Sequence, residues 1–128
     1  MVWKTWSVFE RLWKPLKTAE NILKFCKEKG IPVKCLKSFF RANGKAVTMG
    51  ETDGFCKVVV AAEPKDDTES PYEPGRVVGC HMYGPHSSDI IQEACALISR
   101  KATISQFHDI IHTHPTLTEV LQSAVHGV

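Results

Sequence analysis

The spacing of the apolar residues changes near residue 31, and this change most restricts how the chain can fold. Before it, apolar residues recur every three to four positions, as on one face of an α-helix. They are Ala19, Ile22, Leu23 and Cys26. Thr18 suits an N-cap, Gly30 suits the left-handed position after a helix, and Pro32 prevents continuation. The sequence therefore predicts a helix over residues 18–30 that buries one stripe.

Beyond this point the apolar spacing falls to about two residues, which is typical of β-strands. Two turn signals, Asn43-Gly44 and Asp53-Gly54, interrupt the pattern. The predicted strands are residues 33–40, 46–49, 55–62 and 76–82. Strands joined by short turns run antiparallel, because a parallel crossover needs about a dozen residues or more. An antiparallel sheet is therefore expected.

The segment 63–75, EPKDDTESPYEPG, separates the last two predicted strands. Three prolines, five acidic residues and one lysine give it a local charge of −4 and no apolar period. We predict a solvent-exposed loop, which is unusually long for a hairpin connection.

Helical patterns return after the Gly84-Pro85 pair. Ser87 or Ser88 is the expected N-cap of the first of these helices. Its predicted buried stripe consists of Ile91, Ala94, Cys95 and Ile98. The order of helix, strands and helices predicts an α+β fold, with an antiparallel sheet of about four to five strands flanked by helices.

Two later segments have the spacing of a capping box, in which the N-cap and the third helical residue bind each other's backbone. Thr103 with Gln106 predicts a short helix that runs to about His112. Thr116 with Glu119 predicts a last helix that ends at residue 124 or 125.

The N-terminal part of the chain is strongly basic. Residues 1–50 carry 11 Lys and Arg and 3 Asp and Glu, whereas the rest carries 5 and 11. Such asymmetry marks either a half that faces nucleic acid or a membrane, or lysines that solvate outer surfaces, and we favour the second. No apolar run approaches the ~18 residues of a membrane-spanning helix. We therefore predict neither nucleic acid nor membrane as a partner. Residues 1–17 are amphipathic, and a targeting presequence, a displaced strand and a cloning remnant stay open.

The five cysteines are widely spaced and form no C-x-x-C. This argues against a disulfide scaffold and for a reducing compartment. Six histidines suggest a metal site as one interpretation. His108 and His112 stand four residues apart on a predicted helix. The other candidate ligands are Cys80, His81, His86 and His114. A structural zinc site needs four ligands, and the sequence offers no fourth at suitable spacing, so we predict no metal.

His114 and Glu119 form a second candidate site. His114 precedes a proline, and Glu119 follows in the first turn of the last predicted helix. A carboxylate that accepts a hydrogen bond from an imidazole fixes its tautomer and makes it a stronger base. Alternatively, Glu119 binds only the backbone of Thr116 in its capping box. The two roles are compatible.

The run from His112 to Glu119, HTHPTLTE, resembles the C-terminal H-x-H-P-T-L-[ST]-E signature of dihydrolipoamide dehydrogenases. Four further segments resemble landmarks of the same region in the same order, from about residue 18 to residue 125. They are Lys27–Gly30, Ala42–Ala46, Gly50–Phe55 and Gly79–Pro85. The region is the dimerisation (interface) domain of the flavin-dependent pyridine nucleotide-disulfide oxidoreductases.

This resemblance implies a dimerisation domain at residues 18–128, with an extension at 1–17 and an insertion at 63–75. It implies a homodimer through the sheet and the C-terminal helices, and subunits of a 2-oxo acid dehydrogenase complex as further partners. His114 would take a proton from a dihydrolipoamide thiol, because thiolate is the nucleophile in thiol–disulfide exchange. Glu119 would orient His114, and His114 and Pro115 would approach the partner subunit's flavin. The resemblance and the basic N-terminus favour a mitochondrial location, with a cytoplasmic one as the alternative.

The sequence also departs from the family. FAD and NAD are the family's cofactors, but the flavin-binding G-x-G-x-x-G and the redox C-x-x-x-x-C are absent here. The chain alone is therefore expected to bind neither cofactor and to be inactive. It is interpreted as the interface part of a dihydrolipoamide dehydrogenase-like oxidoreductase. The alternative is a non-catalytic interaction module that binds an intact reductase or a dehydrogenase complex.

Overall fold

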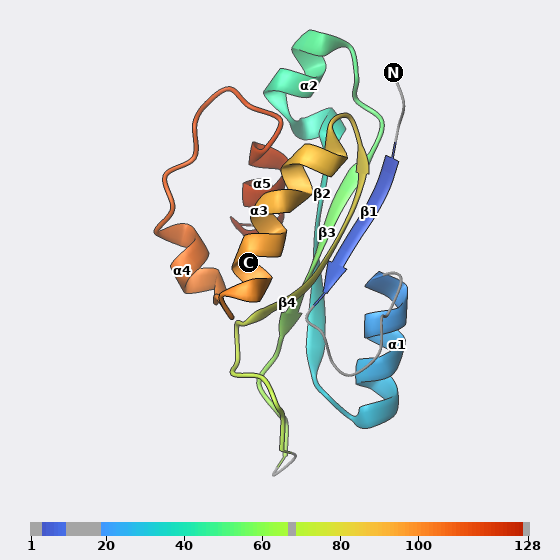
Figure 1. Cartoon of the computed structure of the whole chain (residues 1–128), viewed down its shortest axis with the longest axis vertical. Helices are drawn as coiled ribbons and strands as arrows, with labels where there is room; N and C mark the ends of the chain where they lie inside the picture. Colours follow the sequence, from blue (N-terminus) through green and yellow to red (C-terminus); the bar gives the residue numbers. More distant parts are fainter. Residues whose placement is uncertain (1–3, 10–18, 67–68, 127–128) are drawn as a thin grey trace.

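A computed structural model describes residues 4–9, 19–66 and 69–126, and side chains are described only from residue 23 onward. Its centre is a four-stranded antiparallel sheet in the order β1-β4-β3-β2 (Figure 1). The strands are β1 (Lys4–Phe9), β2 (Val33–Phe39), β3 (Phe55–Ala61) and β4 (Val77–Gly84). The helices are α1 (Ala19–Lys29), α2 (Gly44–Met49), α3 (Ser87–Ser99), α4 (Ile104–His108) and α5 (Glu119–His126), with a 3-10 turn η1 (Phe40–Ala42). The predicted α+β class with an antiparallel sheet is confirmed.

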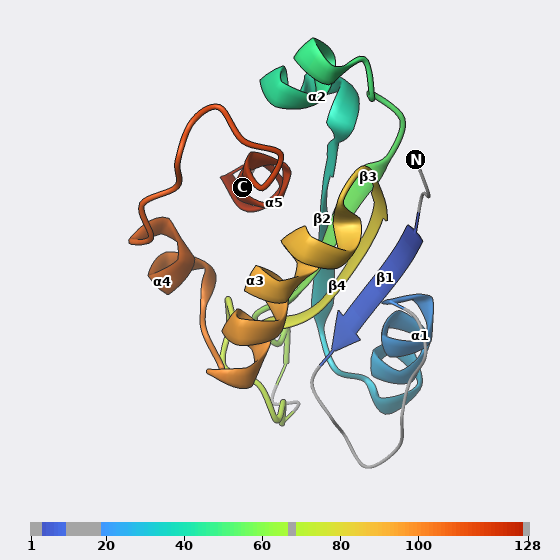
Figure 2. The same ribbon diagram turned by 45° about the horizontal axis from the view of Figure 1, so that its top comes forward.

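The helices form layers on both faces of this sheet (Figure 2). Helices α3 and α5 cover one face, and α1 lies on the other. Along β3, Val58 and Val60 belong to the larger core under α3 and α5, whereas Val59 and Ala61 belong to the smaller core beside α1. This alternation follows from the two-residue period of a strand. No helix in the described part of the chain is long and apolar enough to cross a membrane.

The larger core joins the sheet to the C-terminal helices. Val58 on β3 and Met82 on β4 are buried there together with Phe107 of α4. The main contributions of the two covering helices are Ile90, Ile91, Ala94, Leu97 and Ile98 from α3 and Val120, Leu121, Ala124 and Val125 from α5. The predicted stripe of α3 is confirmed except at Cys95, which is only partly buried.

The N-terminal strand β1 pairs with β4, with Lys4 opposite Gly84 and Phe9 opposite Gly79. Of the interpretations for residues 1–17, a displaced strand therefore fits residues 4–9. Residues 1–3 and 10–18 lie outside the described part, and so does the predicted N-cap Thr18.

The predicted strand at residues 46–49 is wrong, because these residues belong to helix α2. The Asn43 side chain accepts a hydrogen bond from the backbone N–H of Ala46 at 2.9 Å and so caps the helix. Gly50 ends it with φ = 70°. Only Ala46 is buried in this helix. So short an apolar run carries no usable period, and the cap decides the structure instead.

The predicted N-cap of α3 is also wrong. The helix begins at Ser87, and its N-cap is His86, which has φ = 52° and makes no side-chain capping bond. Helix α4 has the predicted capping box of Thr103 and Gln106. It ends at His108, however, so His108 and His112 do not share one helix.

The described parts of the loop, residues 63–66 and 69–75, extend from one end of the sheet (Figure 1). They are not solvent-exposed throughout, because Tyr72 is only 4% exposed and packs into the smaller core with Val59 and Val78. The Arg76 guanidinium lies 5.2 Å from the Tyr72 ring centroid. A single aromatic ring thus anchors a segment whose overall composition predicts exposure.

Candidate acid–base site

His114 and Glu119 lie within hydrogen-bonding distance of each other. The Nδ1 atom of His114 is 3.0 Å from both carboxylate oxygens of Glu119. The ring therefore carries its proton on Nδ1, which donates to the carboxylate. This leaves Nε2 as the nitrogen that can accept a proton from another molecule. The structure thus brings together the two residues that the sequence analysis selected.

Glu119 is held in place by the start of helix α5. It is the first residue of this helix, and the backbone N–H of Thr116 donates to its Oε1 at 2.8 Å. This half of the predicted capping box, the bond from the Thr116 backbone to the Glu119 side chain, is confirmed, but α5 begins at Glu119 and not directly after Thr116 as predicted. The other half is absent, because the Thr116 hydroxyl donates to the carbonyl of Thr113 at 2.9 Å instead. Glu119 therefore serves the backbone and the imidazole at once.

The environment of Glu119 favours its charged form. The hydrogen bond from His114 is the main cause that holds the pKa of the Glu119 carboxyl below its ordinary value of 4.5. Partial burial opposes this, and the bond from the Thr116 N–H adds to the lowering. At neutral pH the pair therefore contains a carboxylate that stabilises an imidazolium once His114 accepts a proton.

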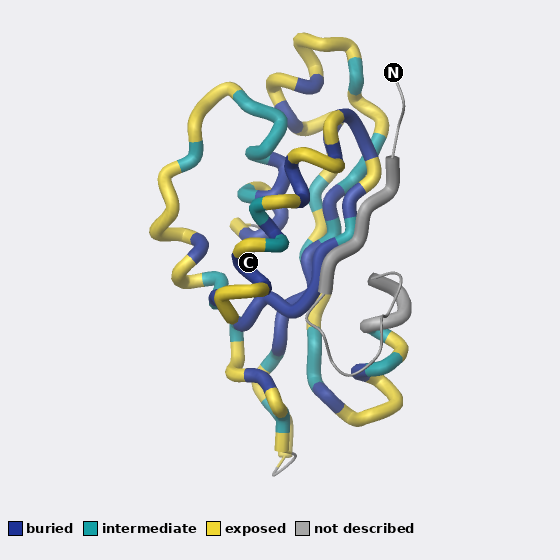
Figure 3. Tube along the Cα trace, viewed as in Figure 1, coloured by how far each residue is buried: buried dark blue, intermediate teal, exposed yellow. Residues whose placement is uncertain are grey.

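His114 is presented to the outside of this chain. Its side chain is 78% exposed, whereas that of Glu119 is 22% exposed. It lies on the connection between α4 and α5, which is exposed along most of its length (Figure 3). Ile111 on the same connection is 95% exposed. His114 and Ile111 are thus both exposed on the same connection, and exposed apolar side chains can mark a surface that a partner covers.

Asn43 supports the site from a distant part of the sequence. Its Nδ2 donates to the carbonyl of Thr116 at 3.0 Å and to that of Leu117 at 3.4 Å, while its Oδ1 caps α2. Asn43 is only 7% exposed. The Asn43-Gly44 pair predicts a turn, whereas Asn43 is the N-cap of helix α2. The sequence signal for a cap is the asparagine itself, because an Asn side-chain oxygen at the N-cap accepts a hydrogen bond from the backbone N–H of the third helical residue, here Ala46.

The other histidines have partners outside the His114–Glu119 pair. His112 Nε2 lies 2.7 Å from Glu93 Oε1 on α3, a partner that the sequence analysis did not identify. The rings of His108 and His126 lie 4.4 Å apart. His81 stacks on Phe55, and His86 Nδ1 lies 3.6 Å from Asp89. The described residues contain no group of three or more side chains that could hold a metal ion. All five cysteines are free.

Taken together, these features define an α+β domain that presents an exposed imidazole–carboxylate pair next to the last helix. The profile of the family "Pyridine nucleotide-disulphide oxidoreductase, dimerisation domain" matches residues 24–125. The chain belongs to this family, whose dimerisation domain forms a homodimer interface in FAD-dependent oxidoreductases.

Individual relatives agree with this assignment. Dihydrolipoyl dehydrogenase of Chlamydia muridarum is 40% identical over 93 residues, which is 73% of this chain and 18% of the relative. That of Synechocystis is 38% identical over 97 residues, 76% of this chain and 18% of the relative. The chain thus spans less than a fifth of the length of these relatives.

Solved structures share the fold. LpdA from Mycobacterium tuberculosis aligns with a TM-score of 0.72 over 96% of this chain and 22% of that chain, at 14% identity. The HOCl-induced flavoprotein disulfide reductase RclA from Escherichia coli aligns with a TM-score of 0.67 over 85% and 22%, at 21% identity.

Proposed function

We propose that this chain is the dimerisation domain of a dihydrolipoamide dehydrogenase-like reductase and supplies His114 and Glu119 to the active site of the partner subunit. The observation that carries this proposal is the exposed His114 ring held by Glu119 through Nδ1. The relatives with about 40% identity are named dihydrolipoyl dehydrogenases, which supports the substrate class.

In the proposed reaction, Nε2 of His114 accepts the proton of a dihydrolipoamide thiol. The resulting thiolate sulfur attacks one sulfur of a disulfide, a new S–S bond forms, and the displaced sulfur leaves as a thiolate. Glu119 stabilises the imidazolium and keeps its Nδ1 proton in place. Histidine is the side chain whose ordinary pKa lies near neutrality, and this residue type therefore suits proton transfer at physiological pH.

FAD, when bound, supplies the acceptor for the two electrons that the dithiol releases, and NAD is their final acceptor. The sequence of this chain has no G-x-G-x-x-G to cradle a dinucleotide pyrophosphate. We therefore place both cofactors on other parts of the enzyme. His114 and Pro115, which are exposed, are the residues that would approach the partner subunit's flavin.

Exposed apolar side chains support a homodimer. Ile111 is 95% exposed, Ile110 is 40% exposed on the same connection, and Val47 is 55% exposed on α2. Apolar side chains that are this exposed in a single chain commonly mark a surface that a partner covers. The proposed interface therefore includes the C-terminal connection that carries His114.

A domain exchange tests the catalytic proposal. Residues 24–125 replace the matching segment of the Chlamydia muridarum dihydrolipoyl dehydrogenase, and dihydrolipoamide-dependent NAD reduction is measured. In this chimera His114→Gln should lower kcat by about 10²- to 10⁴-fold, the usual range for loss of a general base. His86→Gln, which changes another histidine paired with a carboxylate, is the matched control. An active chimera that loses less than about threefold with His114→Gln would refute the proposal, because that loss lies far below the range for a general base.

The alternative is an interaction module that binds an intact reductase or a 2-oxo acid dehydrogenase complex without taking part in the reaction. The exposed Ile111 serves such binding equally well. A binding assay with purified complex subunits separates the two. A module binds unchanged after His114→Gln, and the chimera containing that substitution keeps its activity.

We propose a reducing compartment, because all five cysteines are free. The expectation of a mitochondrial location finds no support among the relatives, which include Chlamydia and Synechocystis proteins. A tagged copy of the chain observed in its own cells would decide between mitochondrion and cytoplasm.

A further inference from the structure

His112 lies in the first part of the connection that carries His114, and it is the residue there that contacts the core of the domain. Every residue from Asp109 to Pro115 is exposed except His112, whose side chain is 6% exposed. Its ring packs against Phe107 of α4, with the ring centroids 5.0 Å apart. His112 thus points inward, two residues before the exposed imidazole of His114.

The inward side of His112 ends on Glu93. Nε2 of His112 and Oε1 of Glu93 are 2.7 Å apart, a short distance typical of a charge-assisted hydrogen bond. Nδ1 of His112 is buried without a hydrogen-bond partner among the described residues. The ring therefore carries its proton on Nε2 and donates it to Glu93, since a proton on Nδ1 would lie buried without an acceptor.

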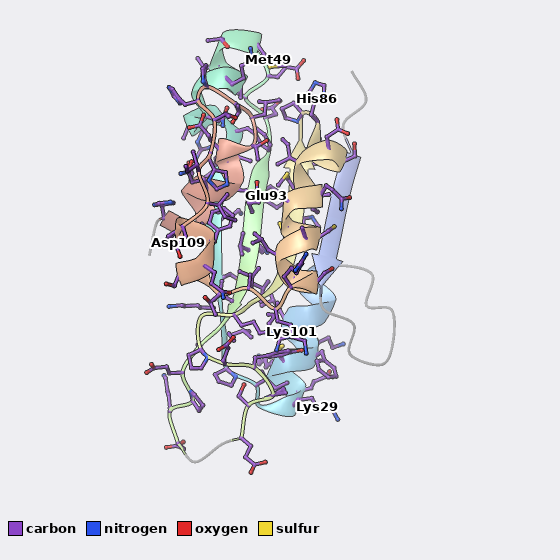
Figure 4. All side chains as sticks on the ribbon, turned by 60° about the vertical axis from the view of Figure 1, so that its left-hand side comes forward. Lys29, Met49, His86, Glu93, Lys101 and Asp109 are labelled. Atoms are coloured by element: carbon purple, nitrogen blue, oxygen red, sulfur yellow. The ribbon has the colours of Figure 1, made fainter. Side chains whose placement is uncertain are left out.

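Glu93 belongs to a rigid part of the fold. It lies near the middle of α3, which packs on β4 and buries Ile90, Ile91 and Ala94 against the sheet. Figure 4 marks Glu93 on this helix and Asp109 where the connection begins. The bond therefore ties an otherwise exposed segment to the core, 19 residues away in sequence.

We propose that Glu93 and His112 are positioning residues that hold the His114–Glu119 pair in its hydrogen-bonded geometry. This inference rests on the proposed function for its importance in catalysis, but the geometry itself is testable without any reaction. Only one residue separates His112 from His114, so loss of the anchor lets the ring of His114 move. A shift of about 1 Å in a reacting group can cost about 10²-fold in rate.

The decisive measurement is the tautomer of His114, read from the ring nitrogen chemical shifts of the full chain at a pH where the ring is neutral. In the wild type the Nδ1–H form should dominate, because Glu119 accepts this proton. Glu93→Ala should lower the ratio of Nδ1–H to Nε2–H by about fivefold, the factor that one ordinary net hydrogen bond represents. His112→Phe keeps a ring against Phe107 and should give the same shift.

Two further variants separate positioning from a general loss of stability. Glu93→Gln retains an oxygen acceptor for His112 and should restore most of the wild-type ratio. Asp89→Asn removes the carboxylate of the 3.6 Å pair with His86 on the same helix and should leave the ratio unchanged. Backbone amide spectra unchanged outside residues 109–119 and the immediate surroundings of the substituted residue show that each variant is folded. An unchanged tautomer ratio in folded Glu93→Ala and His112→Phe would overturn the inference.

The same substitutions in the chimera distinguish this inference from the proposed function. In the chimera, Glu93→Ala should lower kcat with little change in KM. Its loss of kcat should be smaller than that caused by His114→Gln. Full activity of the His114→Gln chimera would refute the proposed function, whereas the tautomer measurement would still decide the positioning role.

Discussion

The side chain of Asn43 binds the backbone carbonyl of Thr116 across 73 positions of sequence, at a distance of 3.0 Å. The same amide caps helix α2 through its other end. Asn43 therefore connects the start of α2 to residues 116–117, which directly precede the first turn of α5 where Glu119 binds His114. The stability of α2 and the geometry of the acid–base pair depend on one buried side chain.

Asn43→Ala should reduce the free energy of unfolding by about 2–3 kcal/mol. About 1 kcal/mol comes from the lost cap, and the remainder from the lost buried hydrogen bond and the unpaired carbonyl of Thr116. Asn43→Ser keeps a capping oxygen but cannot reach Thr116, so it should cost about half as much. Urea denaturation measures both. Equal stability of the alanine variant and the wild type would contradict this account.

Gly54→Ala should destabilise the chain by about 3 kcal/mol. Gly54 has φ = 132°, and a Cβ there would lie 2.2 Å from the carbonyl oxygen of Tyr83. A side-chain movement can relieve neither the backbone strain at this positive φ nor the clash, because the carbonyl oxygen of Tyr83 belongs to the backbone. Gly44→Ala is the matched control, since nothing lies within 4 Å of its Cβ position at the start of α2. Thermal melts should show it neutral or stabilised by up to about 1 kcal/mol.

Glu119→Gln should make folding less dependent on pH in the acidic range. The pKa of Glu119 in the folded chain is lowered, chiefly by the hydrogen bond from His114. An unfolded chain therefore binds this proton more readily than the folded one. The carboxylate thus contributes stability that is fully present above 4.5, the ordinary value, and is lost as pH falls through the lowered folded pKa.

Urea midpoints of Glu119→Gln and the wild type, compared across this range, measure the effect. The wild type should be more stable near neutrality, and the difference should close on acidification. A difference that stays constant with pH would show that the carboxylate charge is not involved.

Ile111→Glu should weaken self-association of the chain without changing its stability. Ile111 is 95% exposed, so its replacement should alter the free energy of unfolding by less than about 0.5 kcal/mol. In a dimer it would place a charge within an apolar contact, which should raise the dissociation constant by about tenfold or more. Sedimentation equilibrium measures this. Ser105→Glu adds the same charge on exposed α4 and is the control, so equal effects of both variants would exclude a specific role for Ile111.

Local patterns in the sequence predicted those features that depend on near neighbours. The change from a helical to a two-residue period placed α1, β2 and β3 within one or two residues, and the Thr103–Gln106 spacing identified the cap of α4. The His114–Glu119 pair was visible in the same way, because the two residues are only five positions apart, but the resemblance to the family was needed to favour it over a capping role of Glu119 alone. The failures lie where local signals are short or conflicting. Residues 46–49 are too few to show a period, and His86 rather than a serine caps α3.

The sequence by itself determined the order of α1, β2, β3, β4, α3, α4 and α5 and the antiparallel direction of β2, β3 and β4, because periodicity, turn signals and capping act along the chain. It also offered the His114–Glu119 pair as one of two interpretations, which the resemblance to the family then favoured. Only the tertiary structure decided that His114 faces outward while His112 is anchored to Glu93, and that Asn43 supports the site from the other end of the fold. These contacts join residues 19 and 73 positions apart. They exist only once the sheet has packed α3 and α5 against one face, and no local preference of the chain specifies them.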